Sequence, residues 1–250
     1  MTDRTDDRNA GQNARQNADA PTDLLTHLDR HTEALLATIA TLTDDQLGSD
    51  SLCAGWTRGH VLSHLARNAE GITRLARAAL DGTGETMYAS TEQRGLDIEA
   101  GARRPVAEQL DDVATTAATL DGALRRLRPE HADLQLERTP GGQRVRIGNL
   151  PAMRLREVVY HHADLAAGFG FDDVEPALLH RFTKLEIALW DDAAQAGRAP
   201  GIQLRTDDGG TWTAGDGAQL VEGSPGALLA WLARGLTDGV RADTLPTRPA

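Results

Sequence analysis

The chain has 250 residues, which is enough for one large domain or two smaller ones that each bury a hydrophobic core. Its formal net charge is -11, and its 26 basic residues are scattered among 37 acidic ones, so we expect no nucleic-acid partner. The single cysteine, Cys53, excludes an internal disulfide. The sequence has no apolar run long enough to span a bilayer and no signal peptide. Together with the single cysteine, these features favour a cytoplasmic protein without a membrane partner.

The N-terminal region changes character near residue 21. Residues 1–21 contain almost no apolar side chain larger than alanine, so we predict a disordered tail. Leucine and isoleucine then recur at helical spacing over residues 24–42, which predicts an amphipathic helix. Thr22 or Asp23 is expected to cap its start.

The central region is predicted to be helical. Thr57 is a typical N-cap, and the apolar positions after it predict a helix to Asp81 that Gly82 ends. The stretch 139–149 contains a Gly-Gly pair and is predicted to be a loop with at most a short strand. Further helices are expected over about 91–100, 105–128, 151–167 and 175–196.

The pattern changes again after residue 200. Three short strands, with a turn at 208–210, are predicted between residues 202 and 221, and Ser224 is expected to cap a last helix. The predicted fold is therefore mainly α, a four-helix bundle followed by a small α+β domain. Its expected parts are a disordered tail over residues 1–21, a helical bundle over 22–198 and a C-terminal α+β domain over 199–250.

Histidines cluster in two of the predicted helices. Residues four apart share a helix face, so Glu157 and His161 can reach a common atom, and so can His60 and His64. His162 is rotated away by about 100° and should face elsewhere. A bundle can present a glutamate and a histidine from one helix and a histidine from a facing helix to one ion. This leaves a coordination position open, as in catalytic zinc sites.

Simpler interpretations of the same residues stay open. Glu157 and His161 can form an exposed ion pair, and a histidine at the edge of the core can be satisfied by an ordinary hydrogen bond. Apolar residues on both sides of His64 and of the Glu157–His161 pair favour a buried position for all three. Cys53 has no base specified near it in the sequence and is interpreted as a small buried hydrophobe.

Two motifs together resemble those of a known family. They are Gly55-Trp56-Thr57 followed by His64-Leu65, and the run REVVYHHADL at 156–165. Over about residues 22–240 the chain is similar to the mycothiol-dependent maleylpyruvate isomerase family, which is part of the DinB/YfiT-like group of metal-binding four-helix bundles. The resemblance implies a DinB-like bundle and a small C-terminal α+β domain.

The resemblance also implies a set of metal ligands. It places zinc, or another divalent cation, on His64, Glu157 and His161, because the family's ligand immediately precedes the leucine of the His-Leu pair. His60 is then a supporting or surface residue. With one cysteine in the chain, a structural cysteine-rich zinc site is excluded.

Three further residues acquire roles from the resemblance. Asp164 would orient a ligand or touch the thiol cofactor, although a surface carboxylate is an equal alternative. Arg234 would clamp a substrate carboxylate, since a guanidinium makes bidentate contacts with carboxylates, or it simply complements the helix dipole. Arg94 is a second candidate for binding an anion, with a solvated arginine as the simpler interpretation.

The implied activity uses an external thiol, mycothiol. A free thiol is only about 3% thiolate at neutral pH, whereas binding to zinc deprotonates it. The thiolate would add to the double bond of a maleylpyruvate-like acid, allow rotation and leave, which makes the protein an isomerase. The alternatives are a mycothiol S-transferase acting on an electrophilic small molecule and a non-catalytic helical regulatory or binding module.

Overall fold

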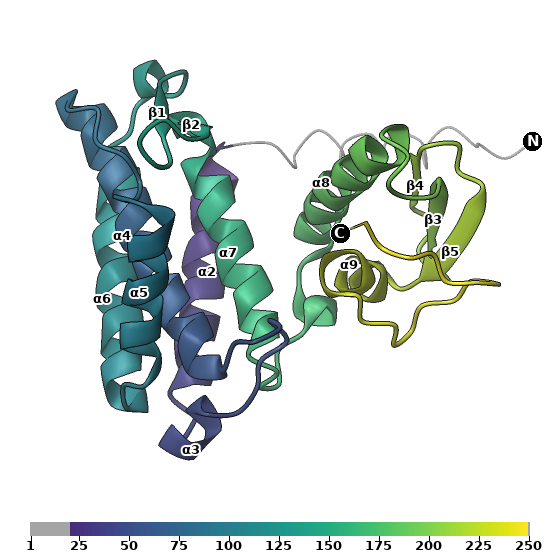
Figure 1. The fold of residues 1–250 in the computed structure, drawn as a ribbon, viewed down its shortest axis with the longest axis horizontal. Coiled ribbons are helices and arrows are strands. Elements are labelled where there is room, and N and C mark those ends of the chain that lie inside the picture. The colour runs from purple at the N-terminus through teal and green to yellow at the C-terminus, as the bar shows by residue number, and fades with distance from the viewer. Residues whose placement is uncertain (1–20, 250) are drawn as a thin grey trace, which may run out of the picture. The chain divides into compact units, whose positions relative to one another are not determined.

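The computed structural model describes residues 21–249 (Figure 1). The predicted tail, apart from Pro21, lies outside these described residues. They divide into two compact units, residues 21–169 and 170–249, and each unit is described by itself. In the described part of the chain, no helix combines the length and the apolar character needed to cross a membrane.

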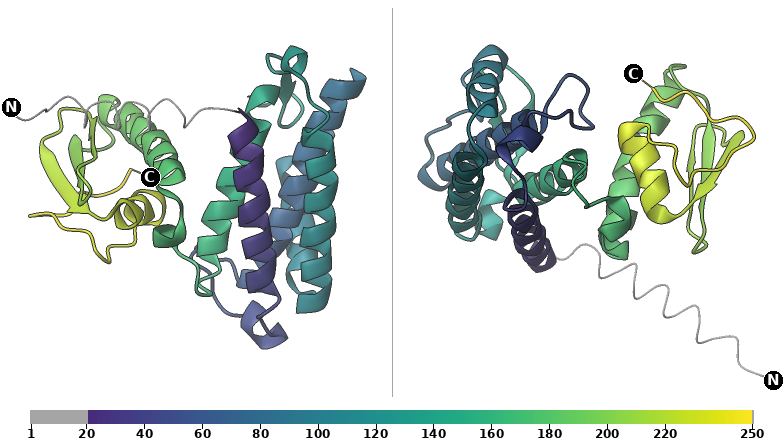
Figure 2. Two further views of the ribbon diagram at one scale, coloured as in Figure 1. Left: turned by 180° about the vertical axis from the view of Figure 1, so that it is seen from behind. Right: turned by 90° about the horizontal axis from the view of Figure 1, so that it is seen from below.

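The first unit is a helical bundle. Helix α4 packs against α5, α6 and α7, and α2 packs against α6 and α7; Figure 2 shows the bundle nearly end-on in its right-hand view. The predicted four-helix bundle is confirmed. The helices of the first unit are α2 (Pro21–Ile39), α3 (Asp44–Leu47), α4 (Arg58–Asp81), α5 (Thr91–Ala102), α6 (Val106–Leu124) and α7 (Leu150–Asp164).

The sequence places some helix ends correctly and others not. The Thr57 side chain accepts a hydrogen bond from the backbone of His60, and Gly82 ends α4 in the left-handed conformation, as predicted. Helix α2 already includes Thr22 and Asp23, so the prediction that one of them caps it is wrong. The short helix α3, which Thr43 caps, was not predicted.

The connections of the first unit contain one hairpin and short 3₁₀ turns. Strands β1 (Gln135–Glu137) and β2 (Arg144–Arg146) pair antiparallel around the predicted Gly-Gly loop. The 3₁₀ turns there are η2 (Pro129–His131) and η3 (Ile147–Asn149), while η4 (Phe171–Asp173) opens the second unit.

The second unit is a small α+β fold with a three-stranded sheet of order β4-β3-β5. Strand β3 pairs antiparallel with β4 and parallel with β5. Helix α8 contacts β4 and helix α9 contacts β3 and β5, and the two helices also pack on each other. The elements are α8 (Pro176–Gln195), β3 (Ile202–Thr206), β4 (Thr211–Ala214), β5 (Gln219–Gly223) and α9 (Pro225–Arg234).

Helix α8 packs within the second unit, against β4 and α9. Its Trp190 is 5.0 Å from Trp231 of α9, measured between ring centroids, and shares a buried cluster with Leu204 of β3. The two compact units of the structure meet before α8, between residues 169 and 170. The apolar stripe of a helix does not itself say which partner covers it.

Candidate metal centre

His64, Glu157 and His161 come together where α4 packs on α7. His64 Nε2 lies 2.9 Å from Glu157 Oε2, and His161 Nε2 lies 3.5 Å from the same oxygen. The ligand atoms of all three residues lie within 4.8 Å of one another. Tetrahedral zinc with ordinary bond lengths would separate nitrogen and oxygen ligands by about 3.4 Å, so small adjustments suffice.

Asp164 fixes the orientation of the His161 ring. Its Oδ2 accepts a hydrogen bond from His161 Nδ1 at 2.7 Å, which leaves His161 Nε2 facing Glu157. Metal-binding histidines commonly donate their second ring N–H to a carboxylate in this way. Asp164 is completely buried, so its interpretation as a surface carboxylate is wrong.

The other histidines of the two helices point elsewhere. His60 Nε2 bonds Glu99 at 2.9 Å, and the other ring nitrogen of His60 closes the capping box at the start of α4. The structure thus brings His64, and not His60, to the pair on α7. His162 bonds the hydroxyl of Thr38 at 2.8 Å, which confirms that it faces away.

Cys53 lies beside the same cluster. Its Sγ donates to Asp164 Oδ2 at 3.1 Å and lies 3.8 Å from His161 Nδ1. The loop that carries Cys53 is tied to the end of α7, because Leu52 N donates to the carbonyl of Asp164 and Arg58 Nε to that of Leu165. The interpretation of Cys53 as a plain hydrophobe is therefore wrong, and its partners lie 108 and 111 residues away in the sequence.

The cluster opens into a pocket of about 290 Å³. The Trp56 ring forms one wall, with its centroid 5.3 Å from that of His64. A pocket that reaches the metal-ligating atoms can admit a small molecule to them. The lining residues are Cys53, Ala54, Trp56, His64, Arg94, Arg138, Glu157 and His161.

Two arginines give the pocket a cationic wall. Arg94 of α5 is half-buried and donates to His64 Nδ1 at 2.9 Å, so its interpretation as a solvated side chain is wrong. Arg94 and Arg138 lie 5.5 Å and 5.9 Å from the centre of the Tyr88 ring. Sequence reasoning missed Arg138, because no motif marks a position just after strand β1.

Burial and hydrogen bonding set the charges of the cluster. Burial lowers the pKa of His64 from 6.5 to about 4, so His64 is neutral at pH 7. Burial raises the pKa of Glu157, but hydrogen bonds from His161 and His64 outweigh it and hold that pKa well below 4.5. Burial lowers the pKa of His161, yet bonds to Asp164, Cys53 and Glu157 raise it overall to about 10. Without a metal, the cluster therefore carries one displaceable proton at pH 7.

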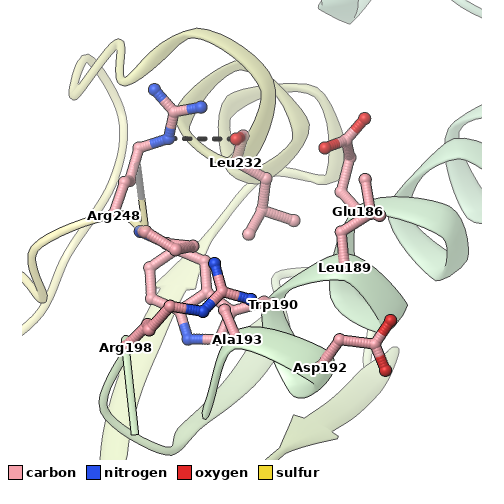
Figure 3. Close-up of a pocket in the computed structure, with 9 residues that line it drawn as sticks. Glu186, Leu189, Trp190, Asp192, Ala193, Arg198, Leu232 and Arg248 are labelled. Atoms are coloured by element: carbon pink, nitrogen blue, oxygen red, sulfur yellow. Dashed lines mark hydrogen bonds between the residues drawn. The ribbon is translucent and has the colours of Figure 1, made fainter. Parts of the chain in front are cut away.

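Arg234 lies in the second unit, in the last turn of α9. Its Nη1 donates to the carbonyl of Ala233 at 2.9 Å. Near it, Arg198 and Arg248 line a cavity of about 380 Å³ over Trp190, in which Arg248 Nε donates to the carbonyl of Leu232 at 3.0 Å (Figure 3). Burial lowers the pKa of Arg248, and the charge of Arg234 lowers it further. This cavity has no histidine or cysteine among its lining residues.

The comparisons with known proteins point to one family. Residues 28–166 match the family model described as the mycothiol maleylpyruvate isomerase N-terminal domain. Two solved structures of mycothiol-dependent maleylpyruvate isomerase, one with a histidine replaced by alanine, match with TM-scores of 0.82 and 0.80. They are 25% and 26% identical to this chain, and each match covers 92% of this chain and 96% of theirs. No curated protein matches the chain.

Proposed function

The chain belongs to the mycothiol maleylpyruvate isomerase family by its N-terminal domain, and from this membership we propose that it is a metal- and thiol-dependent isomerase of a small unsaturated acid. Both structural relatives are named as mycothiol-dependent maleylpyruvate isomerases, which supports mycothiol as the thiol and a maleylpyruvate-like acid as the substrate. The matches extend over both units of the chain, so the likeness is not confined to the bundle.

We propose His64, Glu157 and His161 as the ligands of a divalent cation, zinc in the first instance. The donor set fits, because two imidazoles and one carboxylate with an open position form a catalytic zinc arrangement. Glu157 is already ionised and His64 already neutral, as ligation requires. A cation on His64 Nε2 also requires the His64 proton on Nδ1, so binding must break the hydrogen bond that Arg94 donates to Nδ1. A cation held by these three residues would lower the pKa of a thiol at its open position and so supply a nucleophilic sulfur for the cis double bond of the substrate.

The residues around the cluster have positioning and binding roles in this proposal. Asp164 holds the His161 ring so that Nε2 faces Glu157. Arg94 and Arg138 line the pocket and attract a substrate carboxylate. Arg234 is proposed as a further carboxylate clamp on the strength of the family resemblance, and Asp164 as a contact of the thiol on the same ground.

The observation that carries the proposal is the convergence of His64 with Glu157 and His161 at the floor of an open pocket. The test is isomerisation of maleylpyruvate by zinc-loaded protein, with and without mycothiol, in wild type and in Glu157→Gln. Glu99→Gln is the matched control, since Glu99 makes the equivalent bond to His60.

We expect turnover only with mycothiol, a loss of at least about 100-fold in Glu157→Gln and none in Glu99→Gln. Equal turnover without added thiol would overturn the proposed mechanism. Accumulation of a stable mycothiol conjugate from an electrophile, without isomerisation, would identify an S-transferase instead. Absence of turnover with every substrate and thiol, in a protein that folds equally well without metal, would favour the non-catalytic module.

A further inference from the structure

The opposite side of the His161 ring faces a second set of ligating atoms. Cys53 Sγ, His161 Nδ1 and Asp164 Oδ2 all lie within 4.8 Å of one another. The three separations are 3.8 Å between sulfur and nitrogen, 3.1 Å between sulfur and oxygen, and 2.7 Å between nitrogen and oxygen. The proposed isomerase centre uses the other ring nitrogen, Nε2, and has no need of Cys53.

These three atoms have the chemistry and the spacing of a cation site. Tetrahedral zinc with one sulfur, one nitrogen and one oxygen ligand separates its ligand atoms by about 3.4–3.6 Å, so no separation needs to change by more than about 0.7 Å. The thiol and the imidazole both point a proton at one carboxylate oxygen. A divalent cation placed among the three atoms replaces both protons with one positive centre.

The surroundings hold this arrangement in place. Asp164 is completely buried, and the backbone of Leu52, next to Cys53, is bonded to the carbonyl of Asp164 at 2.9 Å. Cys53 itself is half-buried and lines the pocket, so a cation can reach it from solvent. The sulfur is therefore both accessible and fixed against its two partners.

We propose that Cys53, His161 and Asp164 form a second cation position, selective for soft thiophilic cations such as Cd²⁺. Thiolate ligands favour soft and borderline metals over Mg²⁺ and Ca²⁺. A cation at this second position prevents His161 from binding a cation at the first position with His64 and Glu157. The neutral His161 ring has only one lone pair and carries a proton on its other nitrogen. With a cation on Nδ1, the Nε2 proton of His161 faces Glu157 and satisfies it.

The two positions therefore compete for one cation through the two faces of His161. Hard and borderline cations favour the imidazole and carboxylate set, whereas a soft cation favours the set that contains Cys53. A soft cation bound by Cys53 does not coordinate His64. We therefore expect soft cations to inhibit any activity that requires a cation at the first position. The second position thus gives the protein a built-in sensitivity to thiophilic metals.

The test uses Co²⁺ and Cd²⁺ as spectroscopic probes, because a thiolate ligand produces a sulfur-to-metal charge-transfer absorption and imidazoles and carboxylates do not. The first position is disabled with His64→Ala and, in case that protein does not fold, with Glu157→Gln. Each is compared with the same protein carrying Cys53→Ser in addition. Circular dichroism and thermal unfolding establish that the variants fold.

We expect the charge-transfer band at one cation per chain in His64→Ala or Glu157→Gln. Adding Cys53→Ser should remove the band and weaken Cd²⁺ binding by more than the roughly 10- to 100-fold that loss of an outer-shell partner costs. We also expect bound Cd²⁺ to slow alkylation of Cys53. Cation binding without the band, or alkylation at an unchanged rate with saturating Cd²⁺, would overturn the second position while leaving the isomerase proposal intact.

Discussion

The proton held by His161 makes the pH dependence of metal binding a direct test of the candidate centre. His161 has a pKa of about 10 and His64 one of about 4, so between pH 5 and pH 9 the metal-free cluster holds one proton that a cation must displace. Affinity then rises about tenfold per pH unit, or about 1.4 kcal/mol. Between pH 6 and pH 8 the dissociation constant of Zn²⁺ should fall about 100-fold.

The assay is competition with a chelator of known pH dependence, together with titration calorimetry in two buffers of different ionisation enthalpy. The calorimetry should report one proton released per Zn²⁺ at pH 7. An affinity that changes less than about threefold between pH 6 and pH 8 would refute the assignment of a protonated His161. Release of two protons would instead indicate binding at Cys53, since its thiol must then deprotonate as well.

Three further outcomes are expected. Asp164→Asn, which keeps the shape of the side chain but not its charge, should weaken Zn²⁺ binding by about 10- to 100-fold in the same chelator competition; a change below about threefold would count against its role in orienting His161. Arg94→Met removes a positive charge beside His64, so Zn²⁺ should bind roughly tenfold more tightly while the KM for a carboxylate substrate rises. Weaker binding of both Zn²⁺ and substrate, or tighter binding of both, would contradict this account. Gly59→Ala places a Cβ 2.1 Å from the carbonyl oxygen of Ala102 and should lower the free energy of unfolding by about 1–3 kcal/mol, whereas Gly122→Ala, with open space around it, should not lower it; denaturant melts decide this.

Local signals in the sequence predict local structure well. Thr57 and Gly82 mark the ends of α4 because capping and left-handed backbone depend on the residue itself. The pairing of Glu157 with His161 follows from one helical turn, but the spacing fits His60 as well as His64 on the other helix. The family resemblance favoured His64, and the structure gives the physical reason: His60 is held by Glu99 and by the cap of its own helix.

Contacts between segments far apart in the chain could not be predicted from this single sequence. Cys53 and Asp164 are 111 residues apart, and only the docking of a loop on the end of α7 brings them together. Arg138 reaches the pocket from the turn after β1, where no motif marks it. The apolar stripe of helix α8 would suit a helical bundle or a sheet equally well. In the structure, Trp190 of this stripe packs on Trp231 of α9.

The central claim is that His64, Glu157 and His161 hold a divalent cation. It is tested most directly by measuring Zn²⁺ stoichiometry and affinity in Cys53→Ser protein, in which the second position is removed. His64→Ala and His60→Ala are added separately to this background, so that two histidines one turn apart on α4 are compared. We predict one tightly bound Zn²⁺ per chain with His60→Ala and none with His64→Ala. Equal Zn²⁺ binding by the two proteins, or no binding by the Cys53→Ser parent, would contradict the account.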